Sequence, residues 1–197
     1  TTLIIALLIN AAIAAIAFRF RLVNKSGLVS GAIVGFFIFA VYGWRGFVIL
    51  FTFFLLGSAA TKYRLETKEG MGVAQKNKGA RSVVHVLSNL GVPIVLAVSL
   101  MLAEDYSDAL RFYNAAFTAA IAAALGDTLS TELGQIYGRK CYLLITMERV
   151  RVGTEGAISL QGSLFGLDGI IVLAALAAVT GMFPIDPVKH VVLIGFA

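Results

Sequence analysis

A polar segment, GDTLSTELG at 126–134, directly follows YNAAFTAAIAAAL, one of the most apolar stretches of the chain. It places two carboxylates and three hydroxyls between flanking glycines, at Asp127, Thr128, Ser130, Thr131 and Glu132. Oxygen ligands of this kind suit Mg²⁺, which proteins usually hold with one or two carboxylates together with substrate phosphates. The segment therefore indicates either a metal site or a capped helix end with solvated acids.

Helical geometry decides whether the two acids of this segment can meet. Asp127 and Glu132 are five residues apart, which places them roughly 140° apart on an unbroken helix. Thr128 and Glu132, in contrast, would share a face. Gly126 and Gly134 permit a break, and we expect the helix to end within this segment.

A basic segment, QKNKGARSVVHVLSN at 75–89, has residues suited to a phosphate site. Lysine binds phosphate as a point charge, and arginine binds it through two parallel hydrogen bonds. Gly79 would let backbone N–H groups approach an anion, with a helix N-terminus behind them. A juxtamembrane basic cluster that touches anionic lipid is an equally good interpretation.

A third segment, RVRVGTEGAISLQGSLFGLDG at 149–169, begins a helix with polar and glycine-rich residues aimed into the bilayer. Such a helix start can carry an anion, although its glycines suit close helix packing equally well. Asp168 lies well inside the predicted span, where an ionisable residue is by default a candidate functional residue. Glu155, at the mouth of this helix, is a second candidate ligand.

Several common catalytic motifs are absent from the sequence. It contains no G-x-x-x-x-G-K-[ST] nucleotide-binding loop and neither H-E-x-x-H nor G-x-S-x-G. Cys141 is the single cysteine, which excludes an internal disulfide and is not a metal site by itself.

The elements that must position these segments are membrane helices. The 197 residues are 59% hydrophobic and 14% charged, against roughly 45–50% and 25% in soluble domains. A spanning helix needs about 20 mostly apolar residues. The predicted fold is all-α: a polytopic transmembrane helix bundle that forms one catalytic domain over residues 1–197. Its six complete spans are 3–18, 27–43, 46–61, 83–102, 109–125 and 157–180. A seventh begins at Val188 and is too short to cross, so we expect a further C-terminal helix to complete the protein.

Charge predicts the orientation of the bundle. The connections 19–26, 62–82 and 126–156 hold thirteen of the sixteen lysines and arginines. Positive loops remain in the cytoplasm, so the N-terminus is expected outside and the long basic loops, with the active face, inside. The net charge of +5 then reflects topology rather than binding to nucleic acid.

The three polar segments resemble a known family. KNKGARSVVHVLSN, GDTLSTELGQIYGRKCYLLIT and VRVGTEGAISLQGSLFG are similar, in order and spacing, to the integral-membrane domain-of-unknown-function family 92, which includes plant and cyanobacterial phytyl-phosphate kinases. The resemblance implies Mg²⁺-dependent phosphoryl transfer from a nucleoside triphosphate, typically CTP, to an isoprenoid monophosphate of the phytyl or geranylgeranyl type in the bilayer. The basic segment, KNKGARS, departs from the phytyl kinases proper, which leaves the acceptor open.

The same resemblance implies roles for individual residues. Asp127 and Glu132 would hold Mg²⁺. Lys78 and Arg81 would bind phosphates, and Asn77 would orient those phosphates. The other substrate-binding candidates are Gly79, Ser82, Asn89, Thr128, Ser130, Thr131, Arg151, Thr154, Glu155, Gly156, Ser159, Gly162 and Ser163. The sequence does not assign these residues to nucleotide or acceptor, and it is compatible with a monomer or an oligomer.

Two other functions remain open at this point. A transporter or flippase for an anionic lipid or metabolite would explain an intramembrane Asp168 and broken helices. A lipid cytidylyltransferase would also use CTP and Mg²⁺ but would release pyrophosphate. A kinase acting on a phosphate acceptor needs no strong catalytic base, because the second pKa of a phosphate monoester is about 6.

Overall fold

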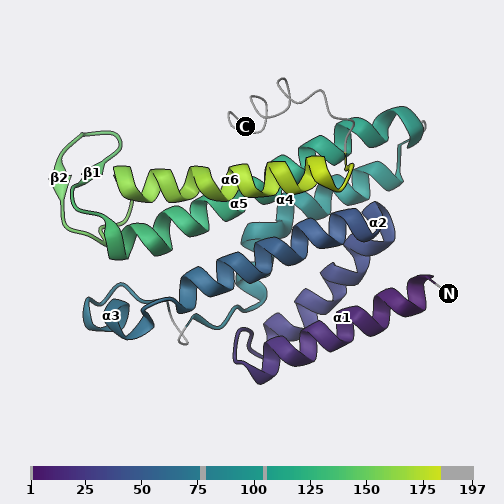
Figure 1. Cartoon of the computed structure of the whole chain (residues 1–197), viewed down its shortest axis with the longest axis horizontal. Coiled ribbons are helices and arrows are strands. Elements are labelled where there is room, and N and C mark those ends of the chain that lie inside the picture. The colour runs from purple at the N-terminus through teal and green to yellow at the C-terminus, as the bar shows by residue number, and fades with distance from the viewer. Residues whose placement is uncertain (1, 76–78, 104–105, 183–197) are drawn as a thin grey trace.

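The computed structural model describes residues 2–75, 79–103 and 106–182 (Figure 1). In chain order the elements are α1 (Thr2–Arg19), α2 (Lys25–Lys62), α3 (Leu65–Gly70), α4 (Val83–Met101), α5 (Tyr106–Tyr137), β1 (Cys141–Leu143), β2 (Arg149–Val150), β3 (Ala157–Ser159) and α6 (Leu160–Val179). The long helices lie alongside one another in a bundle. A helix satisfies its own backbone hydrogen bonds, which is what a segment in lipid requires.

The long helix α2 turns back on itself at Gly43. The backbone there has φ 67° and ψ −163°, a conformation essentially confined to glycine. No atom lies within 4 Å of the place a Cβ would take, so the backbone conformation alone requires glycine. The two halves of α2 run in opposite directions in Figure 1 and match the apolar segments predicted at 27–43 and 46–61.

In the part of the chain that the structure describes, four helices are long and apolar enough to cross a membrane: Lys25–Lys62, Val83–Met101, Ala109–Tyr137 and Leu160–Val179. Ile4–Arg19 is also apolar but shorter. These helices confirm a mostly helical membrane protein. The count of six complete spans and their orientation stay predictions, and the seventh predicted segment lies outside the described residues.

The expectation that helix α5 ends within residues 126–134 is wrong. The helix continues to Tyr137, so the whole GDTLSTELG segment is helical. Gly126 and Gly134 do not break it but lie against α6, where a Cβ on Gly134 would be 3.2 Å from the Cα of Gly162. Close helix packing, rather than a break in the chain, is the reason for these glycines.

Glycines on α6 complete this contact, the most extensive between two elements of the described chain. A Cβ on Gly162 would lie 2.8 Å from the carbonyl oxygen of Ser130, and one on Gly166 would lie 2.9 Å from that of Gly126. Neither position has room for a side chain without a shift of the backbones. The packing interpretation of the glycines in the third segment is thus confirmed.

A small antiparallel sheet also corrects the all-α prediction. Its strands lie in the order β2-β1-β3, and Cys141 of β1 is in register with Val150 on one side and Ser159 on the other. The buried thiol of Cys141 is free. The sheet joins the end of α5 to the start of α6 and holds the two helices in register.

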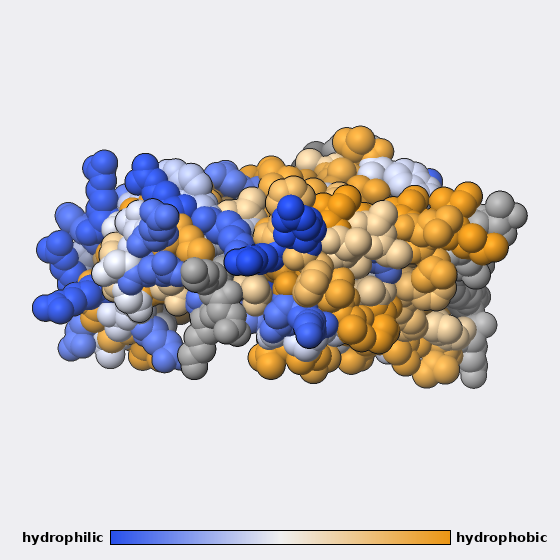
Figure 2. Space-filling model, turned by 90° about the horizontal axis from the view of Figure 1, so that it is seen from below, coloured by the Kyte–Doolittle hydropathy of each residue, from blue (hydrophilic) through white to orange (hydrophobic). Residues whose placement is uncertain are grey.

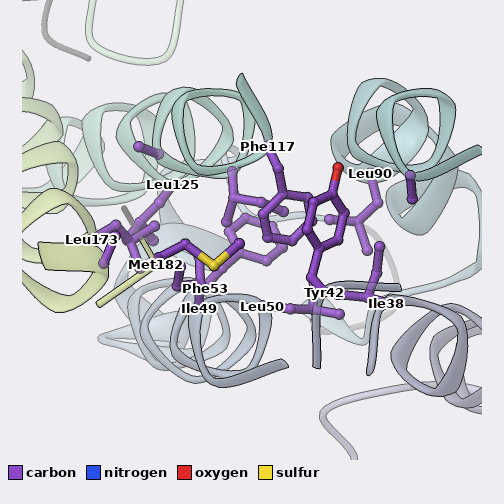
Figure 3. Packing of buried hydrophobic residues seen from close by; sticks show 14 of the residues in the cluster. Ile38, Tyr42, Ile49, Leu50, Phe53, Leu90, Phe117, Leu125, Leu173 and Met182 are labelled. Carbon is purple, nitrogen blue, oxygen red and sulfur yellow. The ribbon is translucent and has the colours of Figure 1, made fainter. Parts of the chain in front are cut away.

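The hydrophobic core lies where α2, α4, α5 and α6 meet (Figure 3). Tyr42 and Phe117 stack at its centre, with ring centroids 4.3 Å apart. Leu90, Leu125 and Leu173 extend the cluster along the bundle. This core fixes α5 against α2 and against α4, whose first turns belong to the basic segment.

Hydrophilic residues gather at one end of the molecule, and hydrophobic residues cover most of the rest in this view (Figure 2). Figure 1 places α3 and the sheet at that polar end and the N-terminus toward the other. The connections predicted to share one side of the membrane, 62–82 and 126–156, therefore lie at the same end of the bundle.

Candidate functional site

Arg81 is fixed by its backbone to the connection between α1 and α2. Its N–H donates to the carbonyl of Leu22 over 2.9 Å, and its carbonyl accepts from the N–H of Asn24 over 3.0 Å. Val23 and Arg81 form a parallel bridge. A Cβ on Gly27 would collide with the Arg81 carbonyl, so glycine permits this close approach.

The guanidinium of Arg81 is buried, and its Nε has no hydrogen-bond partner among the described residues. The residue is 7% exposed, and its Cζ lies 5.1 Å from the ring centroid of Phe53. Burial lowers the pKa of Arg81 to about 10, and the charge of Glu132 opposes that shift. The side chain is therefore still a cation at neutral pH. Within the described part of the chain no carboxylate forms an ion pair with it, and an anion would offset the cost of this burial.

The side chain of Arg81 reaches α5 across Gly57. A Cβ on Gly57 would collide with a terminal guanidinium nitrogen of Arg81 and would lie 3.5 Å from the Cγ2 of Thr128. The basic segment and the polar segment of α5 therefore meet at this glycine. Thr128 is half-buried, and its hydroxyl donates to the carbonyl of Ala124 over 2.8 Å.

Glu132 lies one helical turn beyond Thr128 and is buried in an ion pair. Its Oε2 is 2.5 Å from the Nζ of Lys68, and the two side chains are 1% and 0% exposed. Its Oε1 accepts from the side-chain amide of Gln75 over 2.5 Å. Lys68 also donates to the carbonyl of Ala60 over 2.8 Å, so all of these groups have partners, as buried charges require.

This arrangement gives Glu132 a different role from the predicted one. Both of its oxygens already accept hydrogen bonds from protein groups, so a metal would have to displace Lys68 or Gln75. The side chain ties α3 and the start of the basic segment to α5. It also supplies a negative charge that supports Arg81.

Asp127 is exposed on α5, as is Thr131 one turn later. The unbroken helix separates Asp127 from the buried Glu132, so the two predicted metal ligands do not converge. No group of three or more His, Cys, Asp or Glu side chains is placed to hold a metal in the described ranges. An exposed carboxylate can still share a metal that arrives with substrate phosphates, and Asp127 fits that arrangement. Ser130 is half-buried against α6, where it lies beside Gly166.

The third segment forms an exposed loop between β2 and β3 and then the start of α6. Arg151, Thr154, Glu155 and Gly156 are exposed. The Thr154 hydroxyl donates to the carbonyl of Arg151 over 2.8 Å, which closes a tight turn. This loop presents charged and hydroxyl groups to solvent.

At the start of α6 the predicted residues have structural roles. Ser159 is the N-cap, and its hydroxyl accepts from the N–H of Gly162 over 3.1 Å. Gly162 is buried against α5, while Ser163 and Asp168 are exposed. The exposure of Asp168 means that it does not line the interior of the bundle.

The remaining predictions fall in or after the basic segment. Asn77 and Lys78 lie outside the described residues. Gly79 has a φ of 69°, and a Cβ there would collide with the side chain of Thr61, so it needs glycine. Ser82 is the N-cap of α4 and bonds to the His85 ring, with Oγ 3.0 Å from Nδ1. Asn89 is half-buried within α4.

The three predicted segments come together at the polar end of the bundle. Gln75 joins the basic segment to α5, and the packed glycines join α5 to α6. Gly153 lies so close to the side chain of Val73 that a Cβ there would collide with it, which brings the exposed 151–156 loop against the connection that leads to Arg81. The site is thus a buried cation, a polar helical face and an exposed loop.

Comparison with known proteins decides the family. The model of the integral membrane protein family DUF92 matches residues 8–197. The chain belongs to this family. No solved structure matches it.

Curated DUF92 relatives come from plants, cyanobacteria and archaea. Protein VTE6, chloroplastic, of Arabidopsis thaliana is 32% identical over 158 residues, which are 80% of this chain and 47% of the relative. Uncharacterized membrane proteins of Synechocystis and Methanocaldococcus jannaschii are each 30% identical over 171 residues, 87% of this chain and 65% or 68% of the relative. The chain thus spans about half the length of VTE6 and about two thirds of the other two.

The DUF92 chain holds two site residues that the sequence did not reveal, Lys68 and Gln75. Lys68 is 64 positions from Glu132, and no local spacing links them. Lysine in a membrane connection is normally a solvated or lipid-facing charge. Only the fold, which lays α3 against α5, shows that Lys68 is buried.

Proposed function

We propose that this DUF92 protein transfers a phosphoryl group from a nucleoside triphosphate, typically CTP, to an isoprenoid monophosphate in the membrane. The buried Arg81 carries the proposal. Among the described residues this cation has no carboxylate partner, and its place next to the polar face of α5 suits a phosphate whose lipid chain remains in the bundle. The resemblance to phytyl-phosphate kinases and the similarity to VTE6 support an isoprenoid acceptor.

The two phosphate substrates would approach from different sides. The acceptor phosphate would bind Arg81, because that side chain is buried between α2 and α5. The nucleotide would come from water and bind the exposed 151–156 loop, where Arg151 is accessible. Lys78 and Asn77 are proposed as further phosphate ligands because they precede Arg81 in the same segment.

Asp127 is the proposed protein ligand of Mg²⁺, with nucleotide phosphates as its other ligands. A metal bound in this way would neutralise charge that develops on the transferred group. Glu132 would act indirectly, as a positioning residue, because its ion pair with Lys68 positions the basic segment. Thr128 and Thr131 provide hydroxyls on the same stretch of α5.

In the proposed reaction the main task of the protein is to position the two phosphate substrates. An oxygen of the acceptor phosphate attacks the γ-phosphorus, the bond from that phosphorus to the β–γ bridging oxygen breaks, and the nucleoside diphosphate leaves. The acceptor is largely ionised near neutral pH, since its second pKa is about 6. Catalysis then depends on holding two anions in line and offsetting their repulsion.

The deciding experiment gives the purified protein Mg²⁺, CTP and geranylgeranyl or phytyl monophosphate and follows the products by mass spectrometry. The expected products are isoprenoid diphosphate and CDP. Asp127→Asn should lose Mg²⁺-dependent turnover, whereas Glu148→Gln, an exposed acid on the β1–β2 connection, is the matched control. Release of pyrophosphate with a CDP-lipid would indicate a cytidylyltransferase. No turnover with CTP, ATP or GTP in a chain of the relatives' full length would favour transport.

A further inference from the structure

An apolar pocket lies between α1, both halves of α2 and the start of α4. It contains about 730 Å³ of empty space, including the part that opens to the outside. Its polar lining residues are Asn10, Arg81 and His85, and the rest of its wall is aliphatic, aromatic or glycine. One buried cation in an otherwise apolar wall is suited to a ligand with one anionic head and one hydrocarbon chain.

We propose that this pocket holds the isoprenoid chain of the acceptor and that Gly31 determines how long a chain it admits. The inference rests on the proposed function for the identity of the ligand and extends it to chain-length specificity. Arg81 belongs to the pocket wall, and its guanidinium also lies against Gly57, which Thr128 approaches from α5. A lipid with its phosphate at Arg81 would therefore have its chain in the pocket.

The glycines of α2 mark positions along the pocket. Gly27 packs against the backbone of Arg81, and Gly35 packs against Asn10, whose Oδ1 would be 2.8 Å from an added Cβ. Eight residues of helix separate these two glycines, about 12 Å at 1.5 Å per residue. Asn10 is anchored there because its side-chain amide donates to the carbonyl of Ala32 over 2.6 Å. The pocket therefore runs along α2 from the backbone of Arg81 at Gly27 to the buried amide of Asn10 at Gly35.

Gly31 lies midway along this path and faces open space. It lines the pocket, and nothing lies within 4 Å of the place its Cβ would take. A side chain there would occupy the pocket without displacing protein atoms. A glycine is also a poor helix former, so helix stability does not explain its presence in α2.

The test replaces Gly31 by phenylalanine and compares acceptors of different length. Gly91→Phe is the matched control, because Gly91 is also helical and half-buried, also has nothing within 4 Å of its Cβ position, and does not line the pocket. Binding is measured without nucleotide, as the rise in melting temperature with geranylgeranyl, geranyl or dimethylallyl monophosphate. Turnover is measured separately with CTP.

We expect Gly31→Phe to lower the affinity for geranylgeranyl monophosphate at least about tenfold, because each methylene excluded from an apolar pocket weakens binding severalfold. Dimethylallyl monophosphate should be unaffected, and Gly91→Phe should match the unmodified protein throughout. Gly31→Ala, which adds one methyl group, should lower the affinity in the same direction by a smaller factor. This variant tests the pocket assignment if the phenylalanine variant fails to fold.

Three results would separate the alternatives. Equal binding of geranylgeranyl monophosphate by the Gly31 and Gly91 variants would overturn the pocket assignment. Dioleoyl phosphatidic acid could raise the melting temperature as much as geranylgeranyl monophosphate does, with the rise abolished by Gly31→Phe. That result would overturn the isoprenoid as the ligand and indicate a bulk phospholipid. Chain-length-dependent binding without phosphoryl transfer from any nucleotide would support the pocket and reject the kinase.

Discussion

At the scale of single residues, the proposed contact between Arg81 and the acceptor phosphate predicts a loss of substrate affinity when Arg81 is replaced. Arg81→Gln should raise the KM for the isoprenoid phosphate and lower kcat/KM by about 10- to 100-fold, since a hydrogen bond to a charged group contributes roughly 1.5–3 kcal/mol. Arg139→Gln, at an exposed arginine just after α5, is the control. Steady-state kinetics with varied acceptor test this, and an unchanged acceptor KM would return Arg81 to a structural role.

The buried ion pair predicts a non-additive effect on stability. Lys68→Met alone should destabilise the protein by about 3–5 kcal/mol, because it leaves the carboxylate of Glu132 buried without its counter-charge. The double variant with Glu132→Leu should unfold at a higher temperature than Lys68→Met. Thermal unfolding in detergent of both single variants and the double variant measures the coupling. If the two single effects simply add, Lys68 and Glu132 do not stabilise each other.

The sequence identified residues whose chemistry is visible locally and missed those that depend on the fold. Arg81 was identifiable because it follows lysines and a glycine just before an apolar helix. Lys68 was not, because its partner lies on another helix. The ion pair of Glu132 was not predicted for the same reason: a carboxylate near hydroxyls suggests a metal ligand, and only the fold brings Lys68 beside it.

At the scale of elements, the contact between α5 and α6 predicts sensitivity to added side chains. Gly166→Val should destabilise the protein by about 1–3 kcal/mol, because its Cβ would lie 2.9 Å from the carbonyl oxygen of Gly126 and 3.2 Å from the Cβ of Ser130. Gly91→Val should have little effect, since its Cβ position is open. Melting temperatures in the same detergent compare the two variants, and equal values would show that the helices can move apart at little cost.

Hydropathy predicted where the helices lie but not where α5 ends. Apolar runs identified the helices because a segment in lipid must be both helical and hydrophobic. The helix α5 continues through GDTLSTELG because Gly126, Ser130 and Gly134 still pack against α6, a tertiary effect that hydropathy does not report. The short strands beginning at Cys141 were missed because three residues are too few to give an alternating pattern.

At the scale of the whole molecule, the separation of polar and apolar ends predicts how the chain lies in a membrane. Ile145, on the connection between β1 and β2, is 95% exposed, and Trp44, beside the Gly43 turn, is 54% exposed. With the predicted orientation, a membrane-impermeant thiol reagent should label Trp44→Cys in intact cells and Ile145→Cys only after permeabilisation. Cys141 is buried and should stay unlabelled. The reverse labelling pattern would show that the orientation is opposite to the predicted one. Equal labelling of both variants in intact cells would show that positions 44 and 145 do not lie on opposite sides of the membrane.

The turn at Gly43 has a consequence for how the protein reaches its final topology. A straight helix of 38 residues would be about 57 Å long, nearly twice the hydrocarbon thickness of about 30 Å. If a β-branched residue at this position prevented the reversal, the chain would cross once where it now returns, and every later element would be delivered to the opposite compartment. The proposed phosphate ligands, which the predicted orientation places in the cytosol, would then face the other compartment although none of them had changed. With the predicted spans and orientation, the residue at position 43 would therefore decide on which side of the membrane the proposed phosphate site lies, although it is far from that site.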